Sequence, residues 1–403
     1  MPWNVRNLLG FVLLLASSIV ASTHAARQPA PGDGPRTIQG RVFDDANRNQ
    51  TRDPAEAGLS GIVVSDQFSV ATTASTGGWQ LNAAPNARVV FVSVPDGWTA
   101  SGAFWRAIPA GTAAIEFPLT RRQTASEFTF IHASDTHLSA ASLPRMRLLR
   151  ALVEKTKPAF VLITGDLVRD ALRVSEAEAR GYYDMLVAEL KQFPVPVWTV
   201  PGNHENFGIE REKSQVCTTH PLYGKQMYRH YLGPNYYSFT WGGIRFLGID
   251  SVDIDDMWYY GHVDAAQLEW IKRDLATAPD TTPVVTFNHI PFASAAERLD
   301  GYTEDPPAPT LIRVNGKLLF RHLVSNSFDV LAALRPHRLE IALGGHLHTR
   351  EVLEYQTEEG LRRFHQAGAV VGSNETGGLK MSSGVTLYRV RAGVVDGGTF
   401  LPL

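Results

Sequence analysis

Side chains of the types that bind metal ions follow five separate apolar runs of this sequence. They are Asp135, His137, Asp166, Asn203, His204, His289, His346 and His348. Each run is short and rich in β-branched or aromatic residues, and it ends at a turn, which is typical of a buried strand that opens into a cleft. A single Asp-x-His, or one histidine at a strand end, is most often structural. Eight such residues at five strand ends form a joint pattern that indicates a metal centre.

The donor types restrict the metal and the chemistry. Carboxylates, an amide and imidazoles without thiolates suit Zn, Mn or Fe as divalent or trivalent ions. The donors are too many for one tetrahedral ion. If two ions share one carboxylate, each takes about four protein ligands and keeps room for water and substrate. The sequence contains neither a Gly-x-Ser-x-Gly elbow nor a Gly-rich Walker loop, so two rival chemistries are not favoured.

The elements that must position these residues alternate between strand and helix. Helical spacing of apolar residues covers 143–157 and 175–193, between the strand-like runs. Asp264 with Gln267 three residues later predicts the start of another helix. This alternation predicts an α/β fold. In such a fold, ligands gather outside the carboxyl ends of the strands.

Five motifs occur along the chain in a fixed order. They are Asp135-x-His137, Gly165-Asp166, Gly202-Asn203-His204-Glu205, His289 and Gly345-His346-x-His348. In this order they resemble the calcineurin-like metallophosphoesterase superfamily, over roughly residue 127 to the C-terminus. The resemblance implies a calcineurin-like α/β fold, in which two β-sheets face each other as a sandwich and helices flank them.

The resemblance also implies a role for each residue. One ion would be held by Asp135, His137, Asp166 and His348. The other ion would be held by Asp166, Asn203, His289 and His346, with Asp166 bridging the two. His204 would stabilise charge or protonate the leaving oxygen.

One position departs from the phosphoprotein-phosphatase branch of this superfamily. The acid that orients the histidine of the Asn-His pair in that branch is replaced here by Arg169, and Asp170 follows it. The departure puts an Asp170–His204 dyad in doubt. Arg169 could instead meet a substrate phosphate through its planar guanidinium, and a solvated surface cation is the alternative.

The mechanism expected for such a centre is direct hydrolysis. Two cations neutralise the phosphoryl oxygens and hold a metal-bridging hydroxide in line for attack, so no phosphoenzyme is expected. A phosphodiester, a nucleotide or a phospholipid derivative is the favoured substrate class. The alternative function is cell-surface adhesion or binding by the N-terminal module described below, with the α/β domain as a scaffold.

The N-terminus predicts export. Arg6 precedes the apolar stretch Leu8–Val20, and small residues up to Ala25 follow. This pattern is typical of a secretory signal peptide over residues 1–25, and the stretch is shorter than the roughly 20 apolar residues of a membrane span. A cleaved signal predicts a secreted or periplasmic protein without a transmembrane segment, and an uncleaved anchor is the alternative. Residues 26–35 have the Pro and Gly content of a linker.

Residues 36–122 predict a small β-sandwich module, and residues 127–403 the catalytic domain. Short β-like runs in the first range are separated by turn residues such as Gly77-Gly78. The module resembles Ig-like modules of bacterial surface proteins and the module attached to some secreted calcineurin-like phosphoesterases. That resemblance implies a spacing or adhesion role, with contact to the cell envelope.

Within this module, one twelve-residue loop has oxygen donors at the calcium-loop positions 1, 3, 5, 9 and 12. They are Asp45, Asn47, Asn49, Asp53 and Glu56. Position 6 is Gln50 instead of glycine, and the flanks predict strands instead of helices. Calcium binding and a solvated hairpin tip are both consistent with this sequence.

Composition excludes several other classes. The chain of 403 residues has a formal net charge of −2 and no long basic run, so no nucleic-acid surface is predicted. Cys217 is the single cysteine, which excludes an intrachain disulfide and a thiolate metal cage. Because free cysteines are usually buried, we expect a packed thiol.

Overall fold

The computed structural model describes residues 36–108, 114–306, 308–376 and 378–403. These residues belong to one compact unit, Pro35–Leu403. The signal peptide expected at residues 1–25 and the linker expected at 26–35 lie outside the described residues. No helix in the described ranges is long and apolar enough to cross a membrane.

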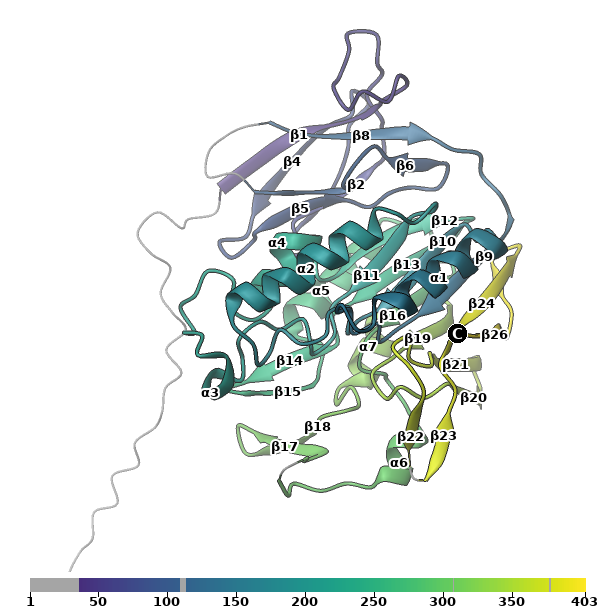
Figure 1. Cartoon of the computed structure of the whole chain (residues 1–403). Helices are drawn as coiled ribbons and strands as arrows, with labels where there is room; N and C mark the ends of the chain where they lie inside the picture. The colour runs from purple at the N-terminus through teal and green to yellow at the C-terminus, as the bar shows by residue number, and fades with distance from the viewer. Residues whose placement is uncertain (1–35, 109–113, 307, 377) are drawn as a thin grey trace, which may run out of the picture. The chain divides into compact units, whose positions relative to one another are not determined.

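Two six-stranded sheets form the domain that begins near residue 127 (Figure 1). The first has the order β11-β10-β9-β24-β25, with β26 paired to β24. Its strands are β9 (Glu127–Ala133), β10 (Phe160–Thr164), β11 (Val197–Val200), β24 (Gly384–Arg391), β25 (Val394–Val395) and β26 (Thr399–Pro402). Strands β9, β10 and β11 are parallel, so their carboxyl ends meet at one edge.

The second sheet has the order β12-β13-β16-β19-β21-β20. Its strands are β12 (Tyr237–Trp241), β13 (Ile244–Ile249), β16 (Val284–Asn288), β19 (Leu339–Gly344), β20 (Glu351–Thr357) and β21 (Gly360–Gln366). Strands β13, β16 and β19 are parallel. The five apolar runs predicted to deliver metal ligands are β9, β10, β11, β16 and β19. The predicted two-sheet α/β fold is therefore confirmed.

Side chains of the first sheet alternate between two apolar cores, as the two-residue period of a strand requires. Phe130 and Phe160 face the second sheet and contact Phe246 edge to face. Val161 and Ile163 point the opposite way and pack in the core that contains helices α1 (Leu143–Thr156) and α2 (Glu176–Leu190). Because both faces are buried, the strands are continuously apolar in sequence.

The helices begin where the sequence predicts. Ser175 caps α2, and the Asp264 carboxylate accepts the N–H of Gln267 at 2.8 Å at the start of α5 (Ala265–Leu275). The shorter helices are α3 (Arg211–Ser214), α4 (Gln226–Leu232), α6 (Ala296–Asp300) and α7 (Ser327–Ala333). Three hairpins extend from the domain: β14 (Val252–Asp255) with β15 (Trp258–Gly261), β17 (Leu311–Val314) with β18 (Lys317–Phe320), and β22 (Asn374–Thr376) with β23 (Leu379–Met381).

The region before residue 122 is all-β, as predicted. It contains two four-stranded sheets, in the orders β4-β1-β8-β6 and β3-β2-β5-β7. The strands are β1 (Arg36–Asp44), β2 (Val63–Ser65), β3 (Val70–Thr72), β4 (Gly78–Ala83), β5 (Val89–Val92), β6 (Trp98–Ala100), β7 (Trp105–Ala107) and β8 (Ile115–Arg121). The sequence did not predict β3, β6 and β7, because three residues are too few to show a period.

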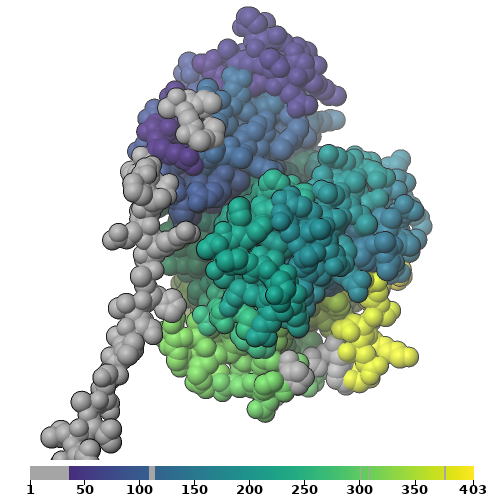
Figure 2. All heavy atoms as spheres, turned by 60° about the vertical axis from the view of Figure 1, so that its left-hand side comes forward, coloured from purple at the N-terminus to yellow at the C-terminus, as the bar shows by residue number. Residues whose placement is uncertain are grey.

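This all-β region shares a hydrophobic core with the following domain. Phe91 of β5 is fully buried, and its ring makes edge contacts with Phe104, Tyr237 and Trp270 at centroid distances of 6.3 to 6.5 Å. In the space-filling view, the two regions adjoin each other (Figure 2). The β-region is therefore part of one folded body with the domain that follows it.

Polar contacts fix the same interface. The side-chain amide of Gln67 donates to the Asn235 side chain at 3.1 Å and to the Tyr236 carbonyl at 3.0 Å. The Tyr236 hydroxyl donates back to the Gln67 carbonyl at 2.7 Å. The Val94 carbonyl accepts the N–H of Thr240 on β12, the edge strand of the second sheet. All of these groups except Thr240 are buried, so their loss would leave unpaired polar atoms in the interior.

The expectation for Cys217 was wrong. Its thiol is exposed, in the segment between α3 and α4, and it lies 3.1 Å from the Thr219 hydroxyl.

We predict that Gln67→Ala lowers the free energy of unfolding by about 1–3 kcal/mol, because the buried Asn235 and Tyr236 oxygens lose a donor. Gln80→Ala, an exposed glutamine of β4, is the matched control and should change it by less than about 0.5 kcal/mol. Urea denaturation measures both values. Equal stability of the two variants would contradict an integrated β-region.

Candidate metal centre

The ligand residues expected from the sequence meet at one edge of the two sheets. Five of them have left-handed backbone conformations at the turns after their strands: Asp135, His137, Asp166, His346 and His348, with φ from 38° to 74°. Non-glycine residues rarely adopt this conformation, and such strain clusters at functional sites. Tight turns after several strands thus direct these side chains into one place.

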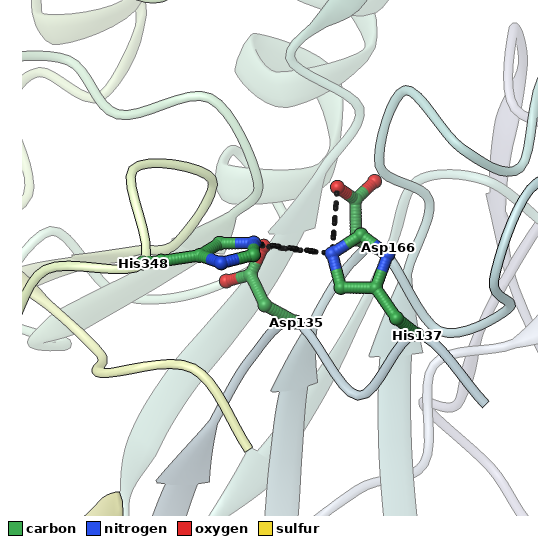
Figure 3. A group of neighbouring side chains, drawn as sticks. All are labelled: Asp135, His137, Asp166 and His348. Carbon is green, nitrogen blue, oxygen red and sulfur yellow. Dashed lines mark hydrogen bonds and ion pairs between the residues drawn. The ribbon is translucent and has the colours of Figure 1, made fainter. Parts of the chain in front are cut away.

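The first group contains Asp135, His137, Asp166 and His348, whose side chains are turned toward one another (Figure 3). The Nε2 atoms of His137 and His348 lie 3.1 Å apart. His348 Nε2 is 3.2 Å from Asp135 Oδ1, and His137 Nε2 is 3.6 Å from Asp166 Oδ2. These atoms are spaced as ligands around one ion would be.

The second group contains Asp166, His289 and His346, and Asn203 joins it. His289 Nε2 lies 3.2 Å from Asp166 Oδ1 and 3.1 Å from Asn203 Oδ1. His346 Nδ1 lies 3.1 Å from the same His289 nitrogen. Asp166 therefore presents one carboxylate oxygen to each group, which is the arrangement of a bridging ligand.

The side chains present fit bound cations. Asp135 and Asp166 are buried, and Asp135 Oδ1 accepts no hydrogen bond. In the described ranges neither carboxylate is paired with a lysine or an arginine. Two buried anions without such partners are costly unless another positive charge is present. The surrounding donors, imidazole and carboxylate, are those that a transition-metal ion takes.

The electrostatics of the group favour positive charge. Burial acts to raise the pKa of Asp166, but His289 and His204 outweigh it and hold that pKa well below its ordinary value. Burial acts to lower the pKa of His289, but the Asp166 charge raises it to about 9. Burial, with His289 and His322 nearby, lowers the pKa of His346. Ionised aspartate and neutral histidine are the forms that bind metals.

Backbone carbonyls set the tautomers of three histidines. The Thr164 carbonyl accepts from His289 Nδ1 at 2.7 Å, so Nε2 is left as the ligand atom. The Arg169 carbonyl lies 2.6 Å from His204 Nδ1 and 3.5 Å from His137 Nδ1. Such partners orient a metal-binding imidazole and keep its other nitrogen free.

His204 lies beside the first group without joining it. Its Nε2 is 3.8 Å from Asp166 Oδ2, and its ring meets His137 edge to face at 4.6 Å. The expected doubt about an acidic dyad partner is supported, because Asp170 instead pairs with Arg173 and the Arg169 carbonyl holds His204. The Arg169 side chain is exposed, and it interacts with the Tyr182 side chain of α2.

Glu205 is a buried carboxylate that holds two ligand loops together. Its oxygens accept the backbone N–H groups of Asp166, Leu167, Val168 and Gly202 at 2.5 to 3.0 Å. Burial and the Asp166 charge raise the pKa of Glu205 to about 8, while the N–H donors favour the ionised form. The carboxylate thus ties the loop after β10 to the loop after β11.

Gly202 permits the close approach of these two loops. A Cβ atom at this position would lie 2.2 Å from Asp166 Oδ1 and 2.4 Å from the Asp166 backbone nitrogen. No side chain fits there without displacing the bridging carboxylate. The glycine of the Gly-Asn-His-Glu motif is therefore explained by space.

The five oxygen donors expected for calcium lie in the loop after β1: Asp45, Asn47, Asn49, Asp53 and Glu56. The side-chain amides of Asn47 and Asn49 lie 2.6 and 3.1 Å from one Asp53 oxygen. Asp45 and Glu56 are buried, and Glu56 Oε1 has no hydrogen-bond partner. The groups of metal-ligating residues found in the described ranges lie at the other centre. Calcium binding stays a prediction of the sequence.

Sequence reasoning missed two residues at the centre. Glu205 was visible within its motif, but no role followed from the motif alone. His322 carried no signal, because it follows β18 in the segment between β16 and β19, away from the strand-end motifs. Its Nδ1 lies 2.6 Å from His346 Nε2. Tyr259 of β15 also packs edge to face on His346.

An α/β fold of two sheets, with two adjoining groups of metal-ligating side chains at the strand ends, is the architecture of a metal-dependent hydrolase. A family model described as calcineurin-like phosphoesterase matches residues 128–350, more than half of the chain. A second model, described as the N terminal of calcineurin-like phosphoesterase, matches residues 46–122. The chain belongs to the calcineurin-like phosphoesterase family.

Two curated proteins are similar to part of the chain. A probable cyclic nucleotide phosphodiesterase of Rhodococcus erythropolis is 27% identical over 174 residues, 40% of this chain and 52% of that protein. A probable glycerophosphodiester phosphodiesterase of Arcobacter nitrofigilis is 23% identical over 184 residues, 42% of this chain and 60% of that protein. The matches thus span only about half of these relatives. A dimetal phosphatase from Danio rerio aligns structurally with a TM-score of 0.42 and 16% identity, over 66% of this chain and 93% of that one.

We predict that Glu205→Gln loosens both loops. An amide in place of one oxygen leaves two backbone N–H groups unpaired, at about 1–3 kcal/mol each, and displaces Asp166. Bound metal per chain, measured by elemental analysis, should fall together with stability. Glu178→Gln on the exposed side of α2 is the control. A fully metallated Glu205→Gln protein of normal stability would rule out this role.

Proposed function

We propose that the protein is an exported, binuclear metal-dependent phosphoesterase that hydrolyses its substrate directly, without a phosphoenzyme. The observation that carries the proposal is the shared Asp166, with one oxygen toward each ligand group. Membership of the calcineurin-like phosphoesterase family supports it. Export rests on the sequence of residues 1–25, and a secreted or periplasmic location follows from it.

Each residue of the site has a role that follows from its position. Two divalent cations held at these groups would neutralise a phosphoryl group and supply an acidified water for attack. Asp135, His137 and His348 hold one side of the site, and Asn203, His289 and His346 the other. His204 donates its Nδ1–H to the Arg169 carbonyl, which leaves Nε2 directed to the site, where the imidazolium form would donate its Nε2 proton to the leaving oxygen.

A phosphodiester is the favoured substrate, with nucleotide and phospholipid derivatives as the two leading kinds. Both curated relatives are named as probable phosphodiesterases. The hairpin β14–β15 favours a substrate that carries an organic group. Its Tyr259 ring contacts the ligand residue His346, and the preceding side chain, Trp258, is exposed. An aromatic wall at a metal centre suits a base, a sugar or an acyl group.

Adhesion through the β-region is the alternative function, with the α/β domain as scaffold. The buried carboxylates of Asp135 and Asp166 argue against a scaffold, since among the described residues no lysine or arginine pairs with them and a protein without a bound cation has no use for two such anions. Contact with the cell envelope remains a proposal that is compatible with catalysis. The proposed calcium loop would belong to this region and not to the reaction.

We expect the mature protein, loaded with Mn²⁺ or Zn²⁺, to hydrolyse bis-p-nitrophenyl phosphate faster than p-nitrophenyl phosphate. Asp166→Asn should bind fewer than one ion per chain and lose at least about 10³-fold in rate, because both ions lose a ligand and one electrostatic contact alone is worth about 10²–10³. Asp170→Asn, three residues before Arg173 and paired with it, should keep both ions and most activity. No turnover of either ester together with no bound ion would favour the adhesion function, whereas two bound ions without turnover would indicate a narrow natural substrate.

His204→Ala gives a separate prediction. Since His204 is placed to protonate the leaving oxygen, its loss should slow hydrolysis of an alkyl phosphodiester by about 10²–10⁴. Hydrolysis of a p-nitrophenyl ester should fall much less, because p-nitrophenolate needs no proton to leave. Bound metal should stay at two ions per chain. Equal losses on both esters would assign His204 to charge stabilisation instead.

A further inference from the structure

His322 lies directly against a ligand residue, although it belongs to none of the five motifs. It follows β18, in the segment that connects the hairpin β17–β18 to α7. Its Nδ1 is 2.6 Å from His346 Nε2, and the two imidazoles are stacked, with centroids 4.9 Å apart at 28°. The contact joins the site to a part of the chain far from the strand ends in sequence.

The His346 ring uses both of its nitrogens. Nδ1 faces the second ligand group, at 3.1 Å from His289 Nε2. Nε2 faces His322. If Nδ1 binds an ion, Nε2 carries the proton and needs an acceptor, because a metal-binding imidazole donates its other N–H to a partner that orients the ring. His322 Nδ1 is the acceptor in place.

The segment that carries His322 is fixed by its own contacts. The N–H of Ser325 donates to the Gly261 carbonyl at 2.8 Å, and the N–H of Val324 donates to the Pro291 carbonyl at 3.0 Å. A Cβ atom on Gly261 would lie 2.0 Å from the Leu323 carbonyl oxygen, so the segment sits tightly on β15. These contacts hold His322 at one distance from the centre.

An aromatic residue limits the movement of both imidazoles. The Tyr259 ring lies at centroid distances of 5.8 Å from His346 and 6.2 Å from His322, edge to face in both cases. Arg321 in turn covers the Tyr259 ring at 4.4 Å. Both imidazoles are therefore restricted in their movement, and the hydrogen bond between them determines the orientation of the His346 ring.

We propose that His322 is a positioning residue of the metal centre. It accepts the hydrogen bond of His346 Nε2 and so presents His346 Nδ1 to the second ion. The inference rests on the proposed binuclear function and adds a residue to it. It also assigns a role to the β17–β18 segment, which is to complete the second ion site from outside the two sheets.

The test is a calorimetric titration of the metal-free protein with Mn²⁺. His322→Leu fills the space without an acceptor, so the second ion should bind about 10–100-fold more weakly, while the first ion binds as in the unchanged protein. His322→Asn places a polar atom near the Nδ1 position and should recover much of the lost affinity. His230→Ala, an exposed histidine of α4, should bind both ions normally.

The outcomes separate this inference from the proposed function. A His322→Leu protein that binds the second ion as tightly as the unchanged protein overturns the inference. So does an equal weakening in His322→Asn, which would mean that packing alone matters. If the unchanged protein binds two ions but hydrolyses no ester, the proposed function fails while the titration still decides the role of His322. An unchanged protein that binds one ion overturns both.

Discussion

The site depends on a carboxylate that does not itself face the ion positions. The ligand residues sit on turns beyond the strands, and a turn receives no hydrogen bonds from its sheet. Glu205 supplies them by accepting four backbone N–H groups from the turns after β10 and β11. A single buried group therefore positions Asp166, which bridges the two ligand groups, relative to Asn203. Burial makes these hydrogen bonds strong and their loss costly.

Charge gives the second constraint. Asp135 and Asp166 are anions in the interior, and the groups nearest to them are imidazole nitrogens. Among the described residues, no lysine or arginine forms an ion pair with either carboxylate. Such a cluster is stable when a cation or protons compensate it. The same carboxylates raise the pKa of His289 to about 9, so the unliganded centre would attract protons. Metal ions and protons thus compete for one site.

The sequence predicted the parts of this protein that depend on local pattern. Strands buried on both faces are continuous apolar runs, and the Asp264–Gln267 cap is visible in the letters. The ligand set followed from strand ends, because parallel strands deliver their carboxyl ends to one edge. His322 could not be predicted, since its partner His346 is 24 residues away and its role depends on packing. The short strands β3, β6 and β7 and the exposed thiol of Cys217 were missed for lack of any periodic signal.

The N-terminal region illustrates how tertiary contacts change an interpretation. Its short strands predicted a separate β-sandwich module, and its resemblance to other modules implied a spacing or adhesion role. In the structure, Phe91 completes a core made largely by the following domain, and Gln67 pairs with Asn235. Asn235 in turn donates to Asp250, which also pairs with Lys225. Asp250 follows β13 in the sheet that carries His289. A buried polar chain therefore runs from the β-region to the second sheet, so a change at Gln67 acts on the same folded body that holds the ligand loops.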